Sequence, residues 1–285
     1  MKNKIKYALF CLVVLSFSFG VLATDGNPWA QVAGPTHETS QVIGFYTNGC
    51  LRGAQELPSP GDGYQTMRPS RRRDFGHPNL IHFIQNLAHQ VRANKNLGTL
   101  LVGDLAQPRG GPTLSSHASH EVGLDVDIWF FTVPDGKILT TEERENMQAP
   151  SMLLPTFESL DLHNWSPEKM ELLKAAALQP ESQRIFVDPL IKKEVCKYYK
   201  GQTWVHKLRP WFLHNDHFHV RILCPMGDKT CESQDEQPDG DGCDSTLDEW
   251  LTPQTAAQER NLSAHPSPPA TPHLPDLCSM VLNEK

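Results

Sequence analysis

Two segments of the chain alternate between apolar and polar residues, a pattern typical of β-strands with one buried face. Residues 124–131 read LDVDIWFF, so that Leu, Val, Ile and Phe alternate with Asp, Asp and Trp. Residues 217–223 read HFHVRIL, so that Phe, Val and Ile alternate with His, His and Arg. Each segment is therefore predicted to bury apolar side chains on one side and to present metal-ligand residue types on the other.

Apolar residues at helical spacing predict three helices. The first follows His77-Pro78, where the proline suits a first turn, and ends before Gly98. The second has Ser166 as its cap and Pro167 at its first position, and the third covers 190 to about 199. Short strands are expected at 100–104 and 184–187. These elements predict an α+β fold, with a small antiparallel sheet that carries the candidate site, flanked by helices and disulfide-stapled loops.

The two ends of the chain differ from its middle. Residues 1–23 combine a lysine-rich start, an apolar stretch and the ending Val-Leu-Ala, which is typical of a cleavable secretory signal peptide. After Cys231 acidic residues, Gly and Pro dominate, and residues 265–275 are proline-rich. We therefore expect a signal peptide at 1–23, one catalytic domain at 24–250, and a Pro-rich tail at 251–285 that covers the body flexibly and is tied back through Cys278.

Composition and charge narrow the function classes. The 285 residues are 39% hydrophobic and carry a formal net charge of −7, which argues against a general nucleic-acid binder. After the N-terminal segment, no apolar run approaches the roughly 18–20 residues that span a bilayer. We expect an exported protein of the periplasm, without a transmembrane segment in the mature chain; its oligomeric state is left open.

The cysteines are consistent with export. Without Cys11, six of the 7 cysteines remain, and an even number in an exported chain indicates three disulfides. Six cysteines allow 15 pairings. The short turn-like stretch between Cys224 and Cys231 favours a bond between these two. A zinc-binding cysteine cluster is disfavoured because no C-x-x-C spacing occurs.

The 13 histidines concentrate in two segments, SSHASHEVGLDVDIW (115–129) and FLHNDHFHVRI (212–222). A catalytic zinc ion takes three protein ligands and keeps a fourth position for water. His120, Asp127 and His219 would supply such a set. His217, on the same strand face as His219, would lie beside the water and take its proton.

Four neighbouring residues have less definite roles. His117 either lines the same pocket or helps to hold a second ion. His214, on the loop before the second alternating strand, is a candidate donor to a developing oxyanion. Asp125 is interpreted as a solvated acid rather than as a partner of a metal ligand. Arg221 has two equally supported interpretations: it orients a ligand or binds a substrate carboxylate, or it is a simple surface charge.

These motifs resemble a known group of zinc peptidases. The chain has H-x(6)-D at His120 and Asp127, followed by H-x-H at His217 and His219. This pattern resembles the motifs of the group that contains lysostaphin-type enzymes, D-Ala-D-Ala metallopeptidases and the hedgehog domain. More narrowly, the chain resembles the penicillin-insensitive murein endopeptidase family. The resemblance covers most of the mature chain, through FGHPNLIHFIQ, GGPTLSSHASHEVGLDVDI, RIFVDP, LRPWFLH, HFHVRILCP and DGDGC.

The resemblance implies a specific metal site, a specific reaction and a specific pairing of the cysteines. It implies zinc on His120, Asp127 and His219, with His117 also a metal position, and catalytic support from His214 and His217. The implied reaction is hydrolysis of the D-alanyl–meso-diaminopimelyl cross-link of peptidoglycan, without a serine nucleophile that β-lactams would acylate. The implied disulfides are Cys50–Cys278, Cys196–Cys243 and Cys224–Cys231.

Two questions stay open at this stage. In PTFESLDLHNW, Asp161 and His163 are available for a second metal ion, but their spacing differs from the family pattern. The alternatives to an endopeptidase are a D,D-carboxypeptidase or dipeptidase of the same group and a non-catalytic, zinc-containing binding module. Retention of His214 and His217 argues against the binding module, because a purely structural zinc site closes its coordination shell.

Overall fold

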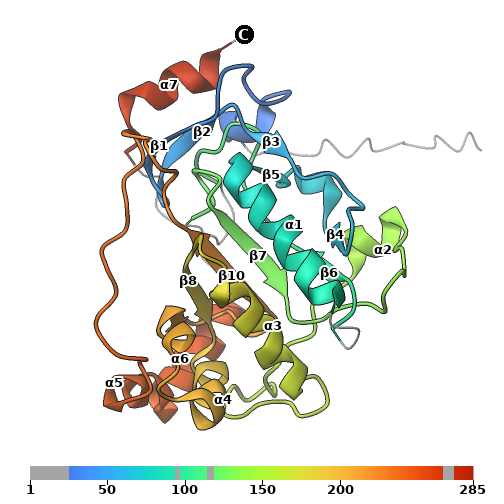
Figure 1. Cartoon of the computed structure of the whole chain (residues 1–285), viewed down its shortest axis with the longest axis vertical. Helices are drawn as coiled ribbons and strands as arrows, with labels where there is room; N and C mark the ends of the chain where they lie inside the picture. The colour runs from blue at the N-terminus through green and yellow to red at the C-terminus, as the bar shows by residue number, and fades with distance from the viewer. Residues whose placement is uncertain (1–25, 94–96, 114–118, 266–272, 285) are drawn as a thin grey trace, which may run out of the picture.

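A mixed six-stranded sheet forms the centre of the molecule in the computed structural model, which describes residues 26–93, 97–113, 119–265 and 273–284 (Figure 1). The strands, in spatial order, are β4 (Tyr64–Thr66), β6 (Leu100–Val102), β7 (Asp125–Trp129), β10 (His217–Ile222), β8 (Ser182–Val187) and β9 (Leu208–Pro210). The four central strands are antiparallel, whereas β4–β6 and β8–β9 are parallel pairs. The α+β class is confirmed. The sheet is larger than predicted and mixed, because a three-residue strand extends each edge.

Helices α1 (Pro78–Ala93) and α3 (Pro167–Leu178) lie across one face of this sheet (Figure 1). The apolar positions of the two alternating segments pack on this face, and all of them are fully buried: Leu124, Val126, Ile128, Phe130, Phe218, Val220 and Ile222. Burial of each such side chain stabilises the folded protein by roughly 1.5–3 kcal/mol. The predicted apolar face is therefore confirmed, and the polar positions are left for the opposite face.

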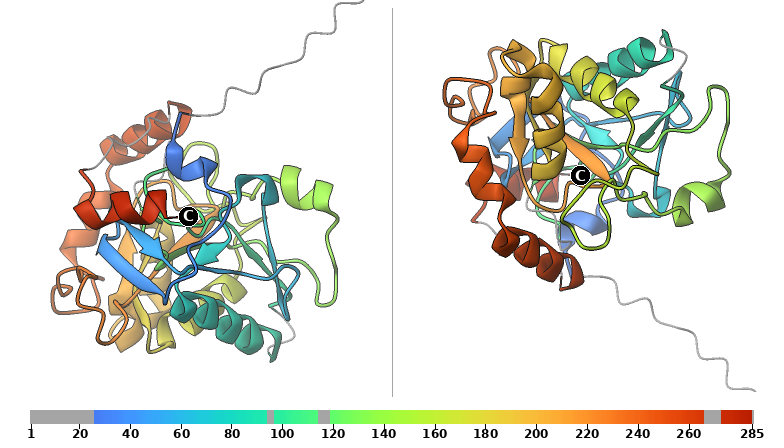
Figure 2. Two further views of the ribbon diagram at one scale, coloured as in Figure 1. Left: turned by 90° about the horizontal axis from the view of Figure 1, so that it is seen from above. Right: turned by 90° about the horizontal axis from the view of Figure 1, so that it is seen from below.

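The remaining elements surround the sheet (Figure 2). They include the hairpin of β1 (Gln41–Phe45) and β2 (Asn48–Arg52), the antiparallel pair of β3 (Gln55–Glu56) and β5 (Phe75–Gly76), and the helices α2 (Thr141–Asn146), α4 (Pro189–Tyr199) and α5 (Ser245–Asp248). Ser166 precedes α3 as predicted, but its side chain makes no capping hydrogen bond. Within the described ranges, no helix has the length and apolarity needed to cross a bilayer.

The C-terminal segment is more ordered than its composition suggested. Residues 253–264 form α6 (Pro253–Ala264) and residues 276–283 form α7 (Asp276–Asn283). Glu259 of α6 and Cys278 of α7 are both buried, and α7 lies beside the β1–β2 hairpin (Figure 1). The expectation of a merely flexible cover is therefore wrong for the described part of the tail. The domain division at residue 250 stays a prediction, and the proposed signal peptide lies outside the described residues.

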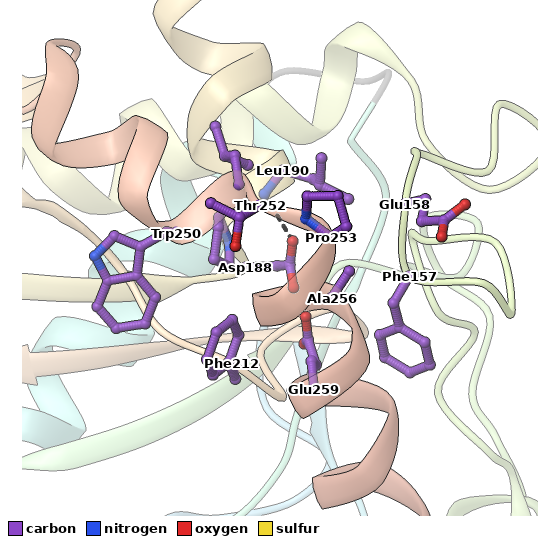
Figure 3. Close-up of a pocket in the computed structure, with 12 residues that line it drawn as sticks. Phe157, Glu158, Asp188, Leu190, Phe212, Trp250, Thr252, Pro253, Ala256 and Glu259 are labelled. Atoms are coloured by element: carbon purple, nitrogen blue, oxygen red, sulfur yellow. Dashed lines mark hydrogen bonds between the residues drawn. The ribbon is translucent and has the colours of Figure 1, made fainter.

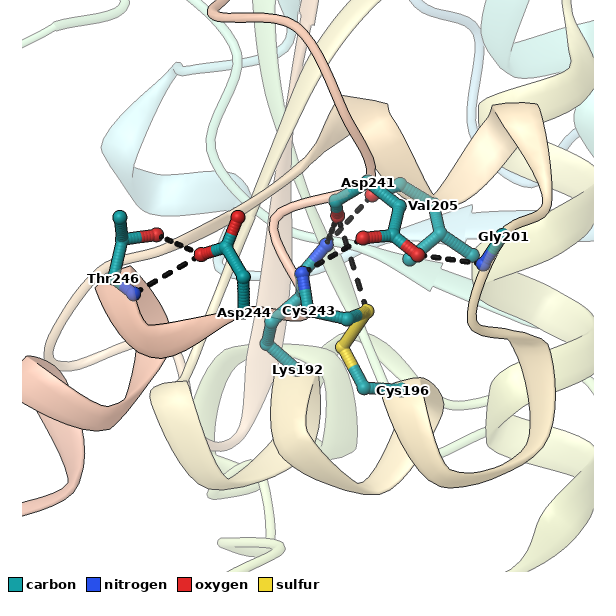
Figure 4. The surroundings of a disulfide bond; sticks show 8 residues. All are labelled: Lys192, Cys196, Gly201, Val205, Asp241, Cys243, Asp244 and Thr246. Atoms are coloured by element: carbon teal, nitrogen blue, oxygen red, sulfur yellow. Dashed lines mark hydrogen bonds between the residues drawn. A yellow bond between two sulfur atoms is a disulfide. The ribbon is translucent and has the colours of Figure 1, made fainter.

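Two disulfides, Cys50–Cys278 and Cys196–Cys243, connect distant parts of the chain, and a third, Cys224–Cys231, closes a short loop. The pairing implied by the family resemblance is confirmed. The Cys196–Cys243 bond joins α4 to the loop that precedes α5, and a buried lysine supports the same loop (Figure 4). Lys192 Nζ donates to the carbonyl oxygens of Val205, at 2.7 Å, and Asp241, at 2.5 Å.

Candidate metal centre

The register between β7 and β10 brings the two histidine-rich segments together. His219 lies directly opposite Asp127, and Arg221 lies directly opposite Asp125. Directly paired residues of antiparallel strands project from the same side of the sheet. The polar faces of both strands therefore meet on the side of the sheet away from α1 and α3.

His120 reaches the same place from the loop before β7. Its backbone adopts the left-handed conformation, with φ of 69°, which histidine accepts more readily than most residues. Its backbone N–H donates to Asp125 Oδ2 at 3.4 Å. Gly123, in the same loop, also has a positive φ, and a Cβ atom there would lie 2.4 Å from the Leu51 side chain. The loop can therefore pass close to β2 and return His120 to the start of β7.

His120, Asp127 and His219 form a candidate metal site. One potential ligand atom from each lies within 4.8 Å of the others. Asp127 Oδ1 is 3.3 Å from His120 Nε2 and 3.3 Å from His219 Nδ1. Burial alone would raise the pKa of Asp127, but the imidazoles of His120 and His217 outweigh it and hold that pKa well below its usual value. Two imidazoles and an ionised carboxylate fit a divalent ion such as zinc, because three protein ligands leave room for water.

Asp125 holds His219 in the orientation that the site requires. It accepts from His219 Nε2 at 2.9 Å, which leaves Nδ1 directed at Asp127. It also accepts from Arg221 Nε at 2.8 Å. Burial would raise the pKa of Asp125, but Arg221 and His219 lower it below its ordinary value.

The interpretation of Asp125 as a solvated acid is therefore wrong, since the residue is completely buried. Arg221 is not a surface charge either: it is 4% exposed, and its guanidinium lies 4.1 Å from the Tyr46 ring centre. Carboxylates that orient metal-ligating histidines in this way raise ligand basicity and metal affinity.

His217 lies at the edge of the candidate metal site. Its Nδ1 is 2.5 Å from Asp216 Oδ1, and its Nε2 is 3.6 Å from Asp127 Oδ1. Burial would lower the pKa of His217, but Asp127 and Asp216 raise it to about 9. The imidazole can therefore hold a proton next to the reacting position.

His214 approaches from the loop before β10. Its ring centre lies 5.0 Å from that of His217 and 5.8 Å from that of His219. Nδ1 lies 2.8 Å from the carbonyl oxygen of Phe212, so this nitrogen carries the proton of the neutral ring. Burial and the two neighbouring imidazoles lower the pKa of His214 well below its usual value. Neutral His214 therefore has its lone pair on Nε2, and it donates from that atom only after taking up a proton.

Two hollows open on either side of His217. One, of about 140 Å³, is mainly polar and includes Arg71, Asp104 and Asp127. The other, of about 350 Å³, contains His214 and His219 and has an aromatic wall of Phe45, Phe186, Trp211 and Phe212. Together they provide room for substrate on both sides of the reacting position.

Other predicted site residues lie elsewhere. His117 lies outside the described residues. Asp161 accepts hydrogen bonds from the His163 backbone and the Asn164 side chain within its own turn, and His163 is exposed. Among the described residues, His120, Asp127 and His219 are the one group with metal-binding geometry, and Asp161 and His163 do not join it.

Sequence reasoning overlooked Asp216. It immediately precedes His217, so strict alternation would direct its side chain to the opposite face. However, β10 begins only at His217, and Asp216 belongs to the preceding loop, where alternation does not apply. The pattern H-x-D-H in residues 214–217 is the signal that was available.

A buried pair of imidazoles and a carboxylate, with further imidazoles beside an open cleft, defines the site of a metal-dependent hydrolase. Residues 42–283 match the family model described as penicillin-insensitive murein endopeptidase. The chain therefore belongs to the penicillin-insensitive murein endopeptidase family, which confirms the resemblance inferred from its motifs.

Individual relatives match over almost the entire length. A penicillin-insensitive murein endopeptidase of Klebsiella pneumoniae (strain 342) is 40% identical over 280 residues, which are 98% of each chain. The protein of the same name from Yersinia enterocolitica is 39% identical over 279 residues, covering 98% of this chain and 97% of the relative. That of Escherichia coli (strain K12 / DH10B) is 38% identical over 280 residues, again 98% of each chain.

Proposed function

We propose that this protein is a zinc-dependent murein endopeptidase that hydrolyses D-alanyl–meso-diaminopimelyl cross-links of peptidoglycan in the periplasm. The observation that carries the proposal is the convergence of His120, Asp127 and His219, within 4.8 Å, beside an open cleft in a member of this family. A periplasmic location agrees with a signal peptide at residues 1–23 and with a peptidoglycan substrate.

Zinc is the metal that best fits the donor set. His120 Nε2, Asp127 Oδ1 and His219 Nδ1 would hold it, with His117 as a further candidate ligand. The ion, when bound, supplies a Lewis acid that polarises the scissile carbonyl and lowers the pKa of water. Asp125 fixes the tautomer of His219, because its carboxylate occupies the Nε2 side of that ring.

The protein's own residues move the protons. His217 Nε2 would take a proton from the attacking water, because an ion on Asp127 would offset the carboxylate charge that raises the pKa of His217. Asp216 holds Nδ1 and stabilises the imidazolium that forms. His214 would donate to the negative charge that develops on the carbonyl oxygen, because that charge would raise its low pKa and favour uptake of a second proton from solvent at Nε2. The imidazolium of His217 then gives the proton that it took from water to the departing amine. No serine is acylated in this scheme, so we expect β-lactams to leave the activity intact.

The proposal is tested by mass spectrometry of muropeptides. Purified protein is expected to convert cross-linked dimers into monomers, and excess chelator is expected to abolish this conversion. Release of only terminal D-alanine would instead identify a carboxypeptidase, and binding without any product would identify a binding module. Full activity in excess chelator would refute the metal mechanism.

A histidine variant separates metal binding from proton transfer. His217→Ala is expected to retain bound zinc but to lose at least 100-fold in turnover, within the range typical of general acid–base catalysis. His82→Ala, on the exposed side of α1, is the matched control and should behave as the unmodified protein. Undiminished turnover in His217→Ala would remove His217 from the role of base.

A further inference from the structure

Two buried carboxyl groups meet behind the candidate site, at a place that the proposed chemistry does not use. Asp188 precedes α4, and its Oδ1 accepts from the backbone N–H of Leu190 at 2.7 Å (Figure 3). Glu259 projects from α6, and its carboxyl group lies next to that of Asp188 (Figure 3). Asp188 is completely buried and Glu259 is 3% exposed. Two carboxyl groups in contact and shielded from water repel each other if both are ionised, so their protonation has to be explained.

Both residues hold the segment that carries His214. Glu259 Oε1 accepts from the backbone N–H of Leu213 at 2.9 Å. The backbone N–H of Asp188 donates to the carbonyl oxygen of His214 at 3.0 Å. Leu213 has φ of 64°, a left-handed conformation that costs a residue with a branched side chain roughly 1–2 kcal/mol. The two hydrogen bonds therefore hold a conformation that the segment would otherwise leave.

We propose that Asp188 and Glu259 share one proton and act together as positioning residues that fix His214 beside the metal centre. The inference rests on the proposed function, because it assigns His214 to that reaction. In this arrangement the protonated carboxyl group of Asp188 donates to the carboxylate of Glu259, which also accepts from Leu213. The tail helix α6 then contributes to the active site without touching substrate.

Charge and burial support one shared proton. Burial raises the pKa of both carboxyl groups, and the adjacent Glu259 raises that of Asp188 further. Two carboxylates in contact cannot both stay ionised in a dry environment. Among the described residues that line the adjoining hollow of about 200 Å³, the only other charged side chain is Glu158, which pairs with Arg260 at 3.6 Å. No described cation of this lining neutralises the pair.

Substitutions at Glu259 test the positioning. Glu259→Ala removes the acceptor for Leu213, so we expect kcat for dimer cleavage to fall at least tenfold, with KM and zinc content unchanged. In Glu259→Gln the amide oxygen still accepts from Leu213 and the amide nitrogen donates to Asp188, so near-normal activity is expected at neutral pH. Gln258→Ala, an exposed neighbour on α6, is the matched control.

The shared proton is tested by the pH dependence of kcat. In Asp188→Asn the side-chain oxygen still accepts from Leu190, and the amide donates to Glu259 without a proton that can be lost. The unmodified protein is expected to lose activity at alkaline pH when the shared proton leaves. This loss is the alkaline limb of the pH profile, and both Asp188→Asn and Glu259→Gln should move it to higher pH. A purely structural role would leave the limb in place.

A measurement on the imidazole separates this inference from the proposed function. In NMR spectra, Glu259→Ala is expected to shift the ring signals of His214, whether or not the protein cleaves murein. Inactivity of the unmodified protein toward dimers would refute the proposed function but not this structural link. Unchanged His214 signals and kcat in Glu259→Ala would overturn the inference. If that variant does not fold, unchanged alkaline limbs in Asp188→Asn and Glu259→Gln would overturn it.

Discussion

Replacing Asp125 with asparagine should weaken metal binding although Asp125 is not itself one of the proposed ligands. The carboxylate accepts from His219 Nε2 at 2.9 Å and from Arg221 Nε at 2.8 Å, and it is completely buried. Asparagine has nearly the same shape but no charge, and one of its two terminal groups donates instead of accepting. It therefore loses at least one of these partners.

The expected magnitude follows from the two partners. Loss of a carboxylate that orients a metal-ligating histidine typically costs 10–100-fold in metal affinity, or about 1.4–2.8 kcal/mol. Arg221, at 4% exposure, would also keep its buried charge without the carboxylate opposite it. Breaking a buried ion pair costs about 3–5 kcal/mol, and we expect Asp125→Asn at the lower end because one hydrogen bond survives.

Two measurements check this prediction. Zinc affinity is measured by competition with a chromophoric chelator, and the free energy of unfolding is measured by denaturant titration in excess chelator. Asp135→Asn, at an exposed carboxylate, is the matched control and should change neither quantity by more than about 0.5 kcal/mol. If Asp125→Asn bound zinc within twofold of the unmodified protein and unfolded at the same denaturant concentration, the assigned role of Asp125 would be refuted.

Three further predictions follow from other parts of the structure. Burial and Arg209 lower the pKa of Lys192 from 10.5 to about 7 in the folded protein. Between these two pH values the unfolded chain therefore binds more protons than the folded protein, and the free energy of unfolding should rise with pH. Lys192→Met should remove that rise, as measured by denaturant titration at pH 7 and 9.5; an identical pH dependence would contradict this. Replacing both Cys196 and Cys243 with serine opens a loop of 47 residues and should cost about 4 kcal/mol of unfolding free energy, whereas a loss below about 1 kcal/mol would argue against this estimate. Trp211→Ala should raise KM for muropeptide dimers at unchanged thermal stability, because the side chain is 55% exposed on the aromatic wall; an unchanged KM would exclude it from substrate binding.

The alternating segments show how much of the fold is local information. The period of two in residues 124–130 and 217–222 correctly separates buried apolar side chains from the polar face, because adjacent residues of a strand point to opposite sides. Proline and apolar spacing likewise locate α1, α3 and α4. The edge strands β4 and β9 are only three residues long, too short for periodicity to reveal them. The helix α6 was missed because its sequence has no clear apolar stripe and its principal buried side chain is the acidic Glu259.

The sequence by itself determined the family, the residue types of the candidate site and the face of each strand that carries them. Tertiary structure decided which of these residues meet. His219 and Arg221 contact Asp125 across separations of 94 and 96 residues, and Glu259 reaches Leu213 across 46. Periodicity states which side of a strand is polar, but not which strand lies next to it or in what register. The neighbouring strand and its register depend on the packing of the whole core. For this reason Asp125, expected to be a solvent-exposed acid, is instead a buried residue that supports the metal centre.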